Sequence, residues 1–234
     1  MYPLTESMKK AMLPVGNRPM IWYALQSLED AGFQEIIVLI RKETEGHNDL
    51  YRYLAETYES KSAKAIRVVE IDNDVNGTAD ALRAAQAHIH AGVLVMSCDL
   101  VANVNIRSMV DEWRIRDADV CMALADSLPH ERGLENKKNA KGIKDYIGLD
   151  VETKTVVYYT PEADVDEELD LSRRMFTQWP RVQLRNDLTD CHLYVMRKWV
   201  VDYIVADTTI SSLKGTGDAV AERVVCAGKL GTQS

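Results

Sequence analysis

The chain has 234 residues, of which 46% are hydrophobic and 27% are charged, a composition typical of a soluble globular protein. Its length suits one sizeable domain, or a domain with a small appendage. The formal net charge of -8 argues against a general nucleic-acid-binding surface, so no DNA partner is expected. The longest apolar runs, 36–40 and 93–96, are far too short to span a bilayer, so no membrane association is expected.

The four cysteines are scattered along the sequence and form no CxxC pair. They are Cys98, Cys121, Cys191 and Cys226. Some lie in apolar, strand-like runs, which favours buried free thiols over the alternatives, disulfides or a zinc site. Free thiols are typical of a reducing compartment, so the sequence predicts a cytoplasmic protein of the cytosol.

Helix-like and strand-like segments alternate along the first half of the chain. Residues 19–31 have the apolar spacing of a helix, and Gly32 is a stop signal for it. A strand at 35–40 has the apolar run of a strand that is buried on both faces. Further strands are predicted at 65–71, 93–97 and 118–124, with helices at 44–60, 78–90 and 106–116. This alternation predicts an α/β, Rossmann-like fold with a mixed, mostly parallel sheet flanked by helices.

The second half of the chain has a different pattern. Residues 126–144 are polar and contain turn formers, which predicts a loop. The remaining elements are predicted as a hairpin of strands at 146–150 and 155–159, strands at 181–184 and 192–196, and a short helix at 197–205.

The N-terminal region has no strand candidate up to residue 17, because prolines and lysines interrupt each short apolar run. A doubly wound sheet usually opens with a strand, a glycine-rich turn and a helix, and that strand lies centrally in the sheet. We therefore predict a domain over 1–212 that is incomplete at its N-terminus. Its first strand and glycine-rich loop are expected to be missing, with the chain beginning inside the first loop.

The most informative stretch is Lys10-Ala-Met-Leu-Pro-Val-Gly-Asn-Arg-Pro19. It resembles the early signature of sugar-1-phosphate nucleotidyltransferases, in which a lysine acts as a point charge on the phosphates of the nucleotide and the sugar phosphate. Lys10 aligns with that lysine. The alternative is that Lys9 and Lys10 are merely exposed loop residues.

Two further features follow in the order that this resemblance implies. In the family, a Gly-Thr-Ala segment approaches the nucleobase and caps a helix, so Gly77 and Thr78 are candidates for nucleotide binding. The alternative for them is a plain helix cap. Asp99 ends an apolar strand, at the sheet edge where open α/β folds bind ligands. A carboxylate there suits Mg²⁺ held between protein and phosphates, and the alternative is a turn residue.

Several departures from the family pattern count against catalysis. Active relatives begin with a strand and a Gly-Gly-x-(Ser/Thr)-Arg loop whose amides cradle the phosphates, and no glycine precedes Lys10. Lys9 replaces the proline that usually precedes the lysine. The family also has a second metal-binding aspartate late in the domain, for which Asp187 and Asp190 are the candidates.

We therefore expect no catalytic residue and no cofactor. The vestigial nucleotide-binding positions are predicted to be Lys10, Gly77, Thr78 and Asp99. Asp99 is also the predicted metal position, and Mg²⁺ is expected only if nucleotide binding is retained.

Several separated motifs together resemble the gamma subunits of eukaryotic translation initiation factor 2B. They are Leu13-Pro-Val-Gly-Asn-Arg-Pro-Met-Ile-Trp-Tyr23, Gly77-Thr-Ala-Asp80, Val95-Met-Ser-Cys-Asp-Leu100, Tyr146-Ile-Gly-Leu-Asp150, Glu162-Ala-Asp-Val-Asp-Glu-Glu-Leu169 and Asp187-Leu-Thr-Asp-Cys-His-Leu-Tyr194. Most of these motifs are weak alone, but their order along the chain is specific.

This resemblance implies a subunit of a cytosolic, multisubunit guanine-nucleotide exchange factor that acts on initiation factor 2 in protein biosynthesis. In that family the gamma subunit pairs with an epsilon subunit, which carries the exchange activity. The nucleotidyltransferase-like domain of the gamma subunit is regarded as a non-catalytic scaffold. Members add a C-terminal left-handed β-helix domain, which we expect to be absent from this chain, and residues 213–234 are predicted to be a divergent tail.

Two alternatives stay open. One is a working sugar-1-phosphate nucleotidyltransferase, similar to mannose-1-phosphate guanylyltransferases, that uses Mg²⁺ and a nucleoside triphosphate. The other is a truncated product without function.

Overall fold

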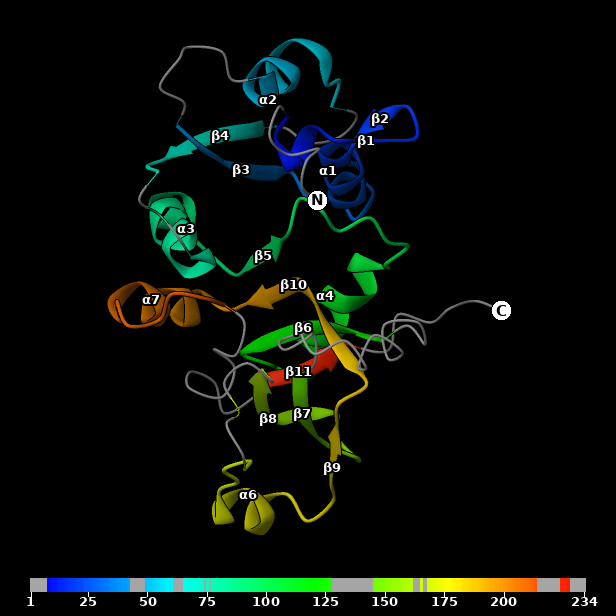
Figure 1. Cartoon of the computed structure of the whole chain (residues 1–234), viewed down its shortest axis with the longest axis vertical. Helices are drawn as coiled ribbons and strands as arrows, with labels where there is room; N and C mark the ends of the chain where they lie inside the picture. Colours follow the sequence, from blue (N-terminus) through cyan, green and yellow to red (C-terminus); the bar gives the residue numbers. More distant parts are fainter. Residues whose placement is uncertain are drawn as a thin grey trace.

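The structure is a computed structural model, and it describes residues 8–42, 49–60, 65–73, 75, 77–127, 145–161, 165, 168–213 and 224–227. The described strands lie one after another along the long axis of the molecule, with helices on both sides of them (Figure 1). The fold is α/β, as the sequence predicts.

The N-terminal region contains a short turn and a very small hairpin. A 3-10 turn, η1 (Lys10–Met12), is followed by β1 (Pro14–Val15) and β2 (Arg18–Pro19), which pair antiparallel. The prediction of no strand up to residue 17 is therefore wrong at β1. Gly16 adopts a φ of 62° and lets the chain fold back tightly, but a strand of this length has no hydrophobic periodicity to detect.

The first helix and the first long strands agree with the sequence. The helix is α1 (Met20–Asp30), and it ends before Gly32, which has a φ of 91°. The strands β3 (Glu35–Arg41) and β4 (Ala65–Ile71) pair in parallel along their whole length. Alternate residues of β3 are buried and the others are partly or fully exposed, which corrects the prediction of a strand buried on both faces.

The long helix predicted at 44–60 is replaced by shorter pieces. A single helical turn, α2 (Asp49–Arg52), runs into a π-helical segment, η2 (Tyr53–Thr57). Leu50 is the buried residue of this stretch, so there is no continuous apolar stripe to stabilise a longer helix. Residues 43–48 lie outside the described residues.

The middle of the chain forms the predicted alternation of helices and strands. The elements are α3 (Thr78–Ala85), η3 (Gln86–His88), β5 (Val93–Met96), α4 (Ile106–Ile115) and β6 (Val120–Asp126). The Asn105 side chain caps α4 by accepting from the Ser108 amide at 2.9 Å. Most of the loop predicted at 126–144 lies outside the described residues.

The C-terminal half confirms the predicted hairpin and helix and adds two elements that the sequence did not predict. The predicted elements are β7 (Asp145–Asp150), β8 (Thr155–Pro161), β9 (Val182–Arg185), β10 (Leu188–Met196) and α7 (Lys198–Ala206). The additional elements are α6 (Arg173–Gln178) and β11 (Val224–Ala227). α6 has no buried residue, so it lacks the apolar stripe by which helices are recognised in a sequence.

A seven-stranded sheet has the order β5-β10-β6-β11-β8-β7-β9. β11 comes from the segment that the sequence sets apart as a divergent tail, yet it lies inside this sheet, parallel to β6 and antiparallel to β8. The other pairs in this sheet are antiparallel. The prediction of a mostly parallel sheet is therefore wrong, because periodicity reveals a strand but not its direction.

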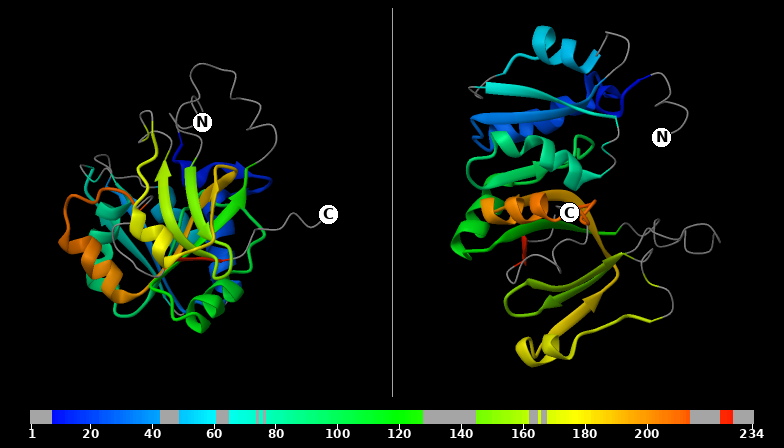
Figure 2. Two further views of the ribbon diagram at one scale, coloured as in Figure 1. Left: turned by 90° about the horizontal axis from the view of Figure 1, so that it is seen from below. Right: turned by 90° about the vertical axis from the view of Figure 1, so that its left-hand side faces the viewer.

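β3 and β5 are neighbours in the stack of strands, but no backbone ladder joins them among the described residues (Figures 1 and 2). Helices link the two sheets instead. Leu28 of α1 packs against the cluster around β3 and also against the cluster that contains Leu94 of β5. The predicted absence of a central strand stays a prediction.

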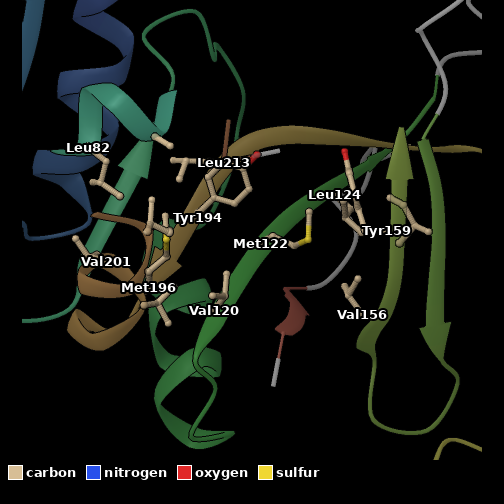
Figure 3. Packing of buried hydrophobic residues seen from close by; sticks show 14 of the residues in the cluster. Leu82, Val120, Met122, Leu124, Val156, Tyr159, Tyr194, Met196, Val201 and Leu213 are labelled. Carbon is tan, nitrogen blue, oxygen red and sulfur yellow. The ribbon is translucent and has the colours of Figure 1, made fainter. Parts of the chain in front are cut away.

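The largest core cluster lies between the seven-stranded sheet and the pair α3 and α7 (Figure 3). It includes Leu82 of α3, Val201 of α7, Met122 of β6 and Tyr194 of β10. Leu213, which follows α7, is buried in the same cluster. The segment after α7 is thus part of the core.

Two predictions from composition can be compared with the described residues. Cys98, Cys121 and Cys191 are free thiols, but of these three only Cys121 is buried, so the prediction of buried free thiols is confirmed for Cys121 alone. No described helix is both long enough and apolar enough to cross a bilayer.

Candidate functional site

The two charged residues singled out by the sequence meet at the end of β5. Lys10 lies in η1, and its ammonium group forms a salt bridge with the Asp99 carboxylate, in the turn that follows β5. The Ser97 hydroxyl also donates to Asp99. The pair is partly open to solvent, with side-chain exposures of 47% for Lys10 and 29% for Asp99. The fold therefore brings together two groups that lie far apart in the sequence.

The environment of Asp99 favours its charged form. Partial burial alone would raise the pKa of this carboxyl, but the hydrogen bonds from Lys10 and Ser97 outweigh burial and hold the pKa below its usual value. The neighbouring Cys98 has a raised pKa, because burial and the Asp99 charge both disfavour a thiolate. The site therefore presents a carboxylate and an ammonium group, and not a reactive thiolate.

The N-terminus of α3, where Gly77 and Thr78 lie, is covered by the backbone of the chain itself. The Ala79 amide donates to the Ser211 carbonyl at 3.1 Å, and the Leu213 amide donates to the Thr78 hydroxyl oxygen at 2.8 Å. A Cβ at Gly77 would overlap the Ser211 carbonyl. Since Gly77 has an ordinary φ of -116°, glycine is needed here for space and not for its backbone conformation.

Arg83 of α3 holds the same segment, residues 207–213, which we call the strap. Its Nη2 atom donates to the carbonyls of Ile204, Asp207 and Ile210 at 2.8, 2.6 and 2.7 Å, and its Nη1 atom donates to Asp80. Ile204 lies in the last turn of α7, where carbonyls have no partner within the helix. Arg83 thereby joins the end of α7 and the strap to α3.

The predicted nucleotide-binding residues thus fall into two groups. Lys10 and Asp99 contact each other, whereas Gly77 and Thr78 contact the strap. No hydrogen bond or ion pair joins the two groups within the part of the chain that the structure describes. Their predicted role in nucleotide binding stays a prediction.

The two candidates for a second metal-binding aspartate have other partners. Asp187 accepts two hydrogen bonds from Arg185, each at 2.7 Å. Asp190 is buried, accepts from the His192 amide at 2.8 Å and accepts from the Tyr194 hydroxyl. Burial raises the pKa of Asp190, although the bonds from Tyr194 and His192 oppose this.

A magnesium site made of protein groups alone does not fit these residues. The described residues contain no group of three or more acidic, histidine or cysteine side chains arranged to hold a metal ion. Asp99 is already engaged by an ammonium group and a hydroxyl. Mg²⁺ usually binds one or two carboxylates together with substrate phosphates, so Asp99 could contribute only alongside a nucleotide.

Two features of this region were missed by the sequence reasoning. Arg83 was not singled out, because an arginine within a predicted helix usually faces solvent. The strap has no periodic pattern, so no signal linked Ser211 and Leu213 to Gly77 and Thr78. A contact across more than a hundred residues depends on the fold and not on local sequence.

A model of the family described as "Nucleotidyl transferase" matches residues 1–135, which is more than half of the chain. The chain belongs to the nucleotidyl transferase family. The match covers all four predicted nucleotide-binding residues.

Two relatives show which kinds of protein the chain resembles in sequence beyond the family match. The translation initiation factor eIF2B subunit gamma of Schizosaccharomyces pombe is 31% identical over 97% of this chain, which covers 49% of that relative. The eIF2B subunit epsilon of the same organism is 24% identical over 82% of this chain, which covers 28% of it. The resemblance to gamma subunits that the motifs predict is confirmed, and the chain spans about half the length of the gamma relative.

A solved structure supports the fold. A protein of Bacillus anthracis described as a glucose-1-phosphate thymidylyltransferase superposes with a TM-score of 0.65 over 98% of this chain and 81% of its own. The identity is 17%, so this likeness concerns the fold alone. The prediction of a Rossmann-like nucleotidyltransferase fold is confirmed.

Proposed function

We propose that this nucleotidyl transferase-family chain serves as a non-catalytic, assembly-forming subunit of a translation initiation factor 2B complex. The similarity to a gamma subunit carries the proposal, because it extends over 97% of the chain at 31% identity. The similarity to an epsilon subunit is lower in both identity and extent. On this proposal the chain supports GDP/GTP exchange on initiation factor 2, acts in the cytosol and needs no cofactor of its own.

An epsilon-type subunit is the proposed direct partner. The chain is also related to epsilon subunits, so the two proteins would contribute similar domains to one assembly. Related domains often associate through equivalent surfaces in a pseudo-symmetric pair. The partner would carry the exchange activity, and this chain would hold the partner in place within the complex.

The local chemistry supports a role without turnover. The ammonium group of Lys10 is paired with Asp99, and the Thr78 hydroxyl accepts a bond from Leu213. A catalytic site for phosphate transfer needs positive charge and donors that point at the phosphates. Here the ammonium group of Lys10 is paired with a carboxylate, and Gly77 and Thr78 lie against the strap.

Co-purification tests the proposed function. A tagged full-length version of the protein, expressed in its own cells, is expected to recover an epsilon-type subunit and the wider complex in near-stoichiometric amounts. A tagged, unrelated nucleotidyltransferase of similar size is the control. Recovery of no epsilon-type partner under conditions that preserve the complex would refute the proposal.

The family match favours one second candidate, a sugar-1-phosphate nucleotidyltransferase. Such an enzyme would release pyrophosphate from a nucleoside triphosphate in the presence of Mg²⁺ and a hexose phosphate. Turnover that Asp99→Asn abolishes would establish this activity and count against the scaffold. We expect no pyrophosphate release above the rate of the Asp99→Asn variant.

A further inference from the structure

Two half-buried thiols lie at matched positions of neighbouring strands. β5 and β10 are side by side in the seven-stranded sheet and run antiparallel (Figure 1). Their ladder ends at Met96 of β5, but the Ser97 amide still donates to the His192 carbonyl at 3.1 Å, so the pairing continues past the end of the strand. One residue further on, the same register places Cys98 opposite Cys191.

This position in an antiparallel pair suits a disulfide. Opposite residues alternate between hydrogen-bonded and non-hydrogen-bonded pairs, and the bond from Ser97 makes the next pair, Cys98 and Cys191, a non-hydrogen-bonded one. The Cα atoms of such a pair lie about 4.5 Å apart, within the range of roughly 4.4–6.8 Å that a disulfide spans. The register therefore predicts two thiols within bonding reach of each other.

Packing contacts place both thiols on the α1 side of the sheet. Cys191 packs against the cluster that contains Leu193 of β10, and Leu94 of β5 packs against the same cluster. Cys98 packs against the cluster around β3, and Leu28 of α1 packs against both clusters. The two side chains thus share one side of the sheet, as a bond between them requires.

β10 is irregular at Cys191, which gives this part of the chain room to adjust. His192 has a φ of 53°, and its amide donates to the Asp190 carboxylate at 2.8 Å. Among the described residues, Cys191 and His192 have no ladder partner in β6. Cys191 can therefore shift towards Cys98 without breaking a strand pair with β6.

We propose that Cys98 and Cys191 form a redox modification site, which a small-molecule disulfide such as glutathione disulfide converts into an intramolecular disulfide between the ends of β5 and β10. The thiolate of one cysteine attacks a sulfur atom of the oxidant and releases one glutathione. The thiolate of the other cysteine then attacks the mixed disulfide and releases the second. Two cysteines are oxidised, one oxidant disulfide is reduced to two thiols, and the protons lost by the cysteines are taken up by the released glutathione thiolates.

The charge of Asp99 affects how fast this disulfide forms. Burial and the Asp99 charge raise the pKa of Cys98, which slows attack by its thiolate. The raised pKa also withholds from the reduced form the stabilisation that a thiolate would supply, so it does not oppose the disulfide at equilibrium. The bond would fix the chain directly before Asp99, and would thereby link the redox state to the segment that carries the salt bridge with Lys10.

Peptide mapping of the wild-type chain tests the site. The folded chain is equilibrated with glutathione buffers from reduced to oxidised, free thiols are alkylated, and a tryptic digest is analysed by mass spectrometry without reduction. Tryptic peptides 84–107 and 186–197 each contain a single cysteine, so a disulfide joins them only through Cys98 and Cys191. We expect this linked pair to be the main disulfide of the folded chain and to disappear in reduced glutathione.

The chain unfolded in urea is the control for geometry. Without the fold, disulfides should form between cysteines close in sequence, Cys98 with Cys121 and Cys191 with Cys226, because short loops cost less entropy to close. Cys121→Ala is the matched variant, since Cys121 is buried and lies on β6. We expect it to keep the link, and Cys98→Ser and Cys191→Ser to lose it.

Hydrogen exchange at the Ser97 amide measures the effect on the two strands, because this amide bonds across to β10. We expect oxidation to slow its exchange by roughly tenfold or more in the wild type, and to leave it unchanged in Cys191→Ser.

Two results would overturn the proposal. One is a folded chain that gives only glutathione adducts at Cys98 or Cys191 and no link between them. The other is a link that forms no more readily in the folded chain than in urea. Both measurements use the wild-type chain, so they decide the question even if the serine variants fail to fold. Neither result bears on whether an epsilon-type subunit co-purifies.

Discussion

The two groups of predicted nucleotide-binding residues are held in different ways. Lys10 and Asp99 meet through side chains at a partly exposed place between η1 and the end of β5. Gly77 and Thr78 meet the backbone of the strap, next to the buried Leu213. Solvent and salt screen an exposed ion pair, whereas the strap contacts break only when core packing is disturbed. The salt bridge between Lys10 and Asp99 can therefore weaken without a change in core packing. The contacts of Gly77 and Thr78 with the strap are part of the packing of the domain.

The largest effect is expected from removing the residue that anchors the strap. Arg83→Ala deletes the donor to three carbonyls, and the Arg83 side chain is only 17% exposed. We expect the free energy of unfolding to fall by about 3 kcal/mol, because carbonyls at the end of α7 lose a charged partner. Urea denaturation followed by circular dichroism measures the change.

Arg52→Ala is the matched control for this experiment. Arg52 is exposed, and among the described residues its guanidinium has one ion pair, with Asp49 at 4.0 Å. Its loss should change the free energy of unfolding by less than about 0.5 kcal/mol. Equal losses in the two variants would show that Arg83 does not anchor the strap.

A smaller effect is expected from the contact between Thr78 and Leu213. Thr78→Val keeps the shape of the side chain but removes the oxygen that accepts from the Leu213 amide. We expect a loss of about 1 kcal/mol in the free energy of unfolding, the usual net value of one hydrogen bond. Thr78→Ser keeps the hydroxyl and should retain the bond and a Leu213 amide protected from hydrogen exchange. If valine and serine are equivalent at this position, the bond does not contribute.

The pH dependence of stability should separate two of the three candidate metal-binding carboxylates, Asp99 and Asp190. Asp99 has a lowered pKa, so its contribution is present at neutral pH and is lost as the pH falls. Asp190 has a raised pKa, so its contribution is present below the unfolded value of about 3.9 and is lost as the pH rises through the folded value. The free energy of unfolding of wild type, Asp99→Asn and Asp190→Asn should be measured between about pH 2 and about pH 7, so that the range includes the pH region in which Asp99 is protonated.

The two asparagine variants are expected to diverge from the wild type in opposite directions. As the pH rises, Asp99→Asn should become less stable relative to the wild type, and Asp190→Asn should become more stable relative to it. The physical reason is that Asp99 gains partners for its charge, while Asp190 is buried beside Tyr194. Parallel pH profiles for the two variants would contradict this assignment.

The sequence predicts the elements of this fold better than their arrangement. β4 was predicted residue for residue, and α1 and α4 to within one residue at each end, because a long apolar stripe or run marks each of them. β11 was missed, although Val224 and Val225 are typical strand residues. Strand direction was also missed, because it depends on how the chain returns to the sheet and not on local periodicity.

In the candidate site, too, the sequence indicated individual residues better than the contacts between them. The strand end at Asp99 and the motif around Lys10 were enough to select both residues, but the salt bridge between them was not predicted. Nothing in the sequence around Thr78 indicates that Leu213 would bind it, because the packing of α7 against α3 and the bonds of Arg83 bring these distant residues together. Long-range backbone contacts of this kind leave no periodic signal.

The smallest effect is expected at the salt bridge between Lys10 and Asp99. A double-mutant cycle of Lys10→Met and Asp99→Asn isolates the energy of their interaction from other effects of each change. Because both side chains are partly exposed, we expect a coupling of about 0.5 kcal/mol at low salt and a smaller value at about 1 M salt, where screening is strong. A coupling of about 2 kcal/mol that salt does not change would instead place the pair in a rigid, desolvated site. The Lys10–Asp99 pair would then be held as firmly as the strap contacts, and the proposed difference between the two groups would be wrong.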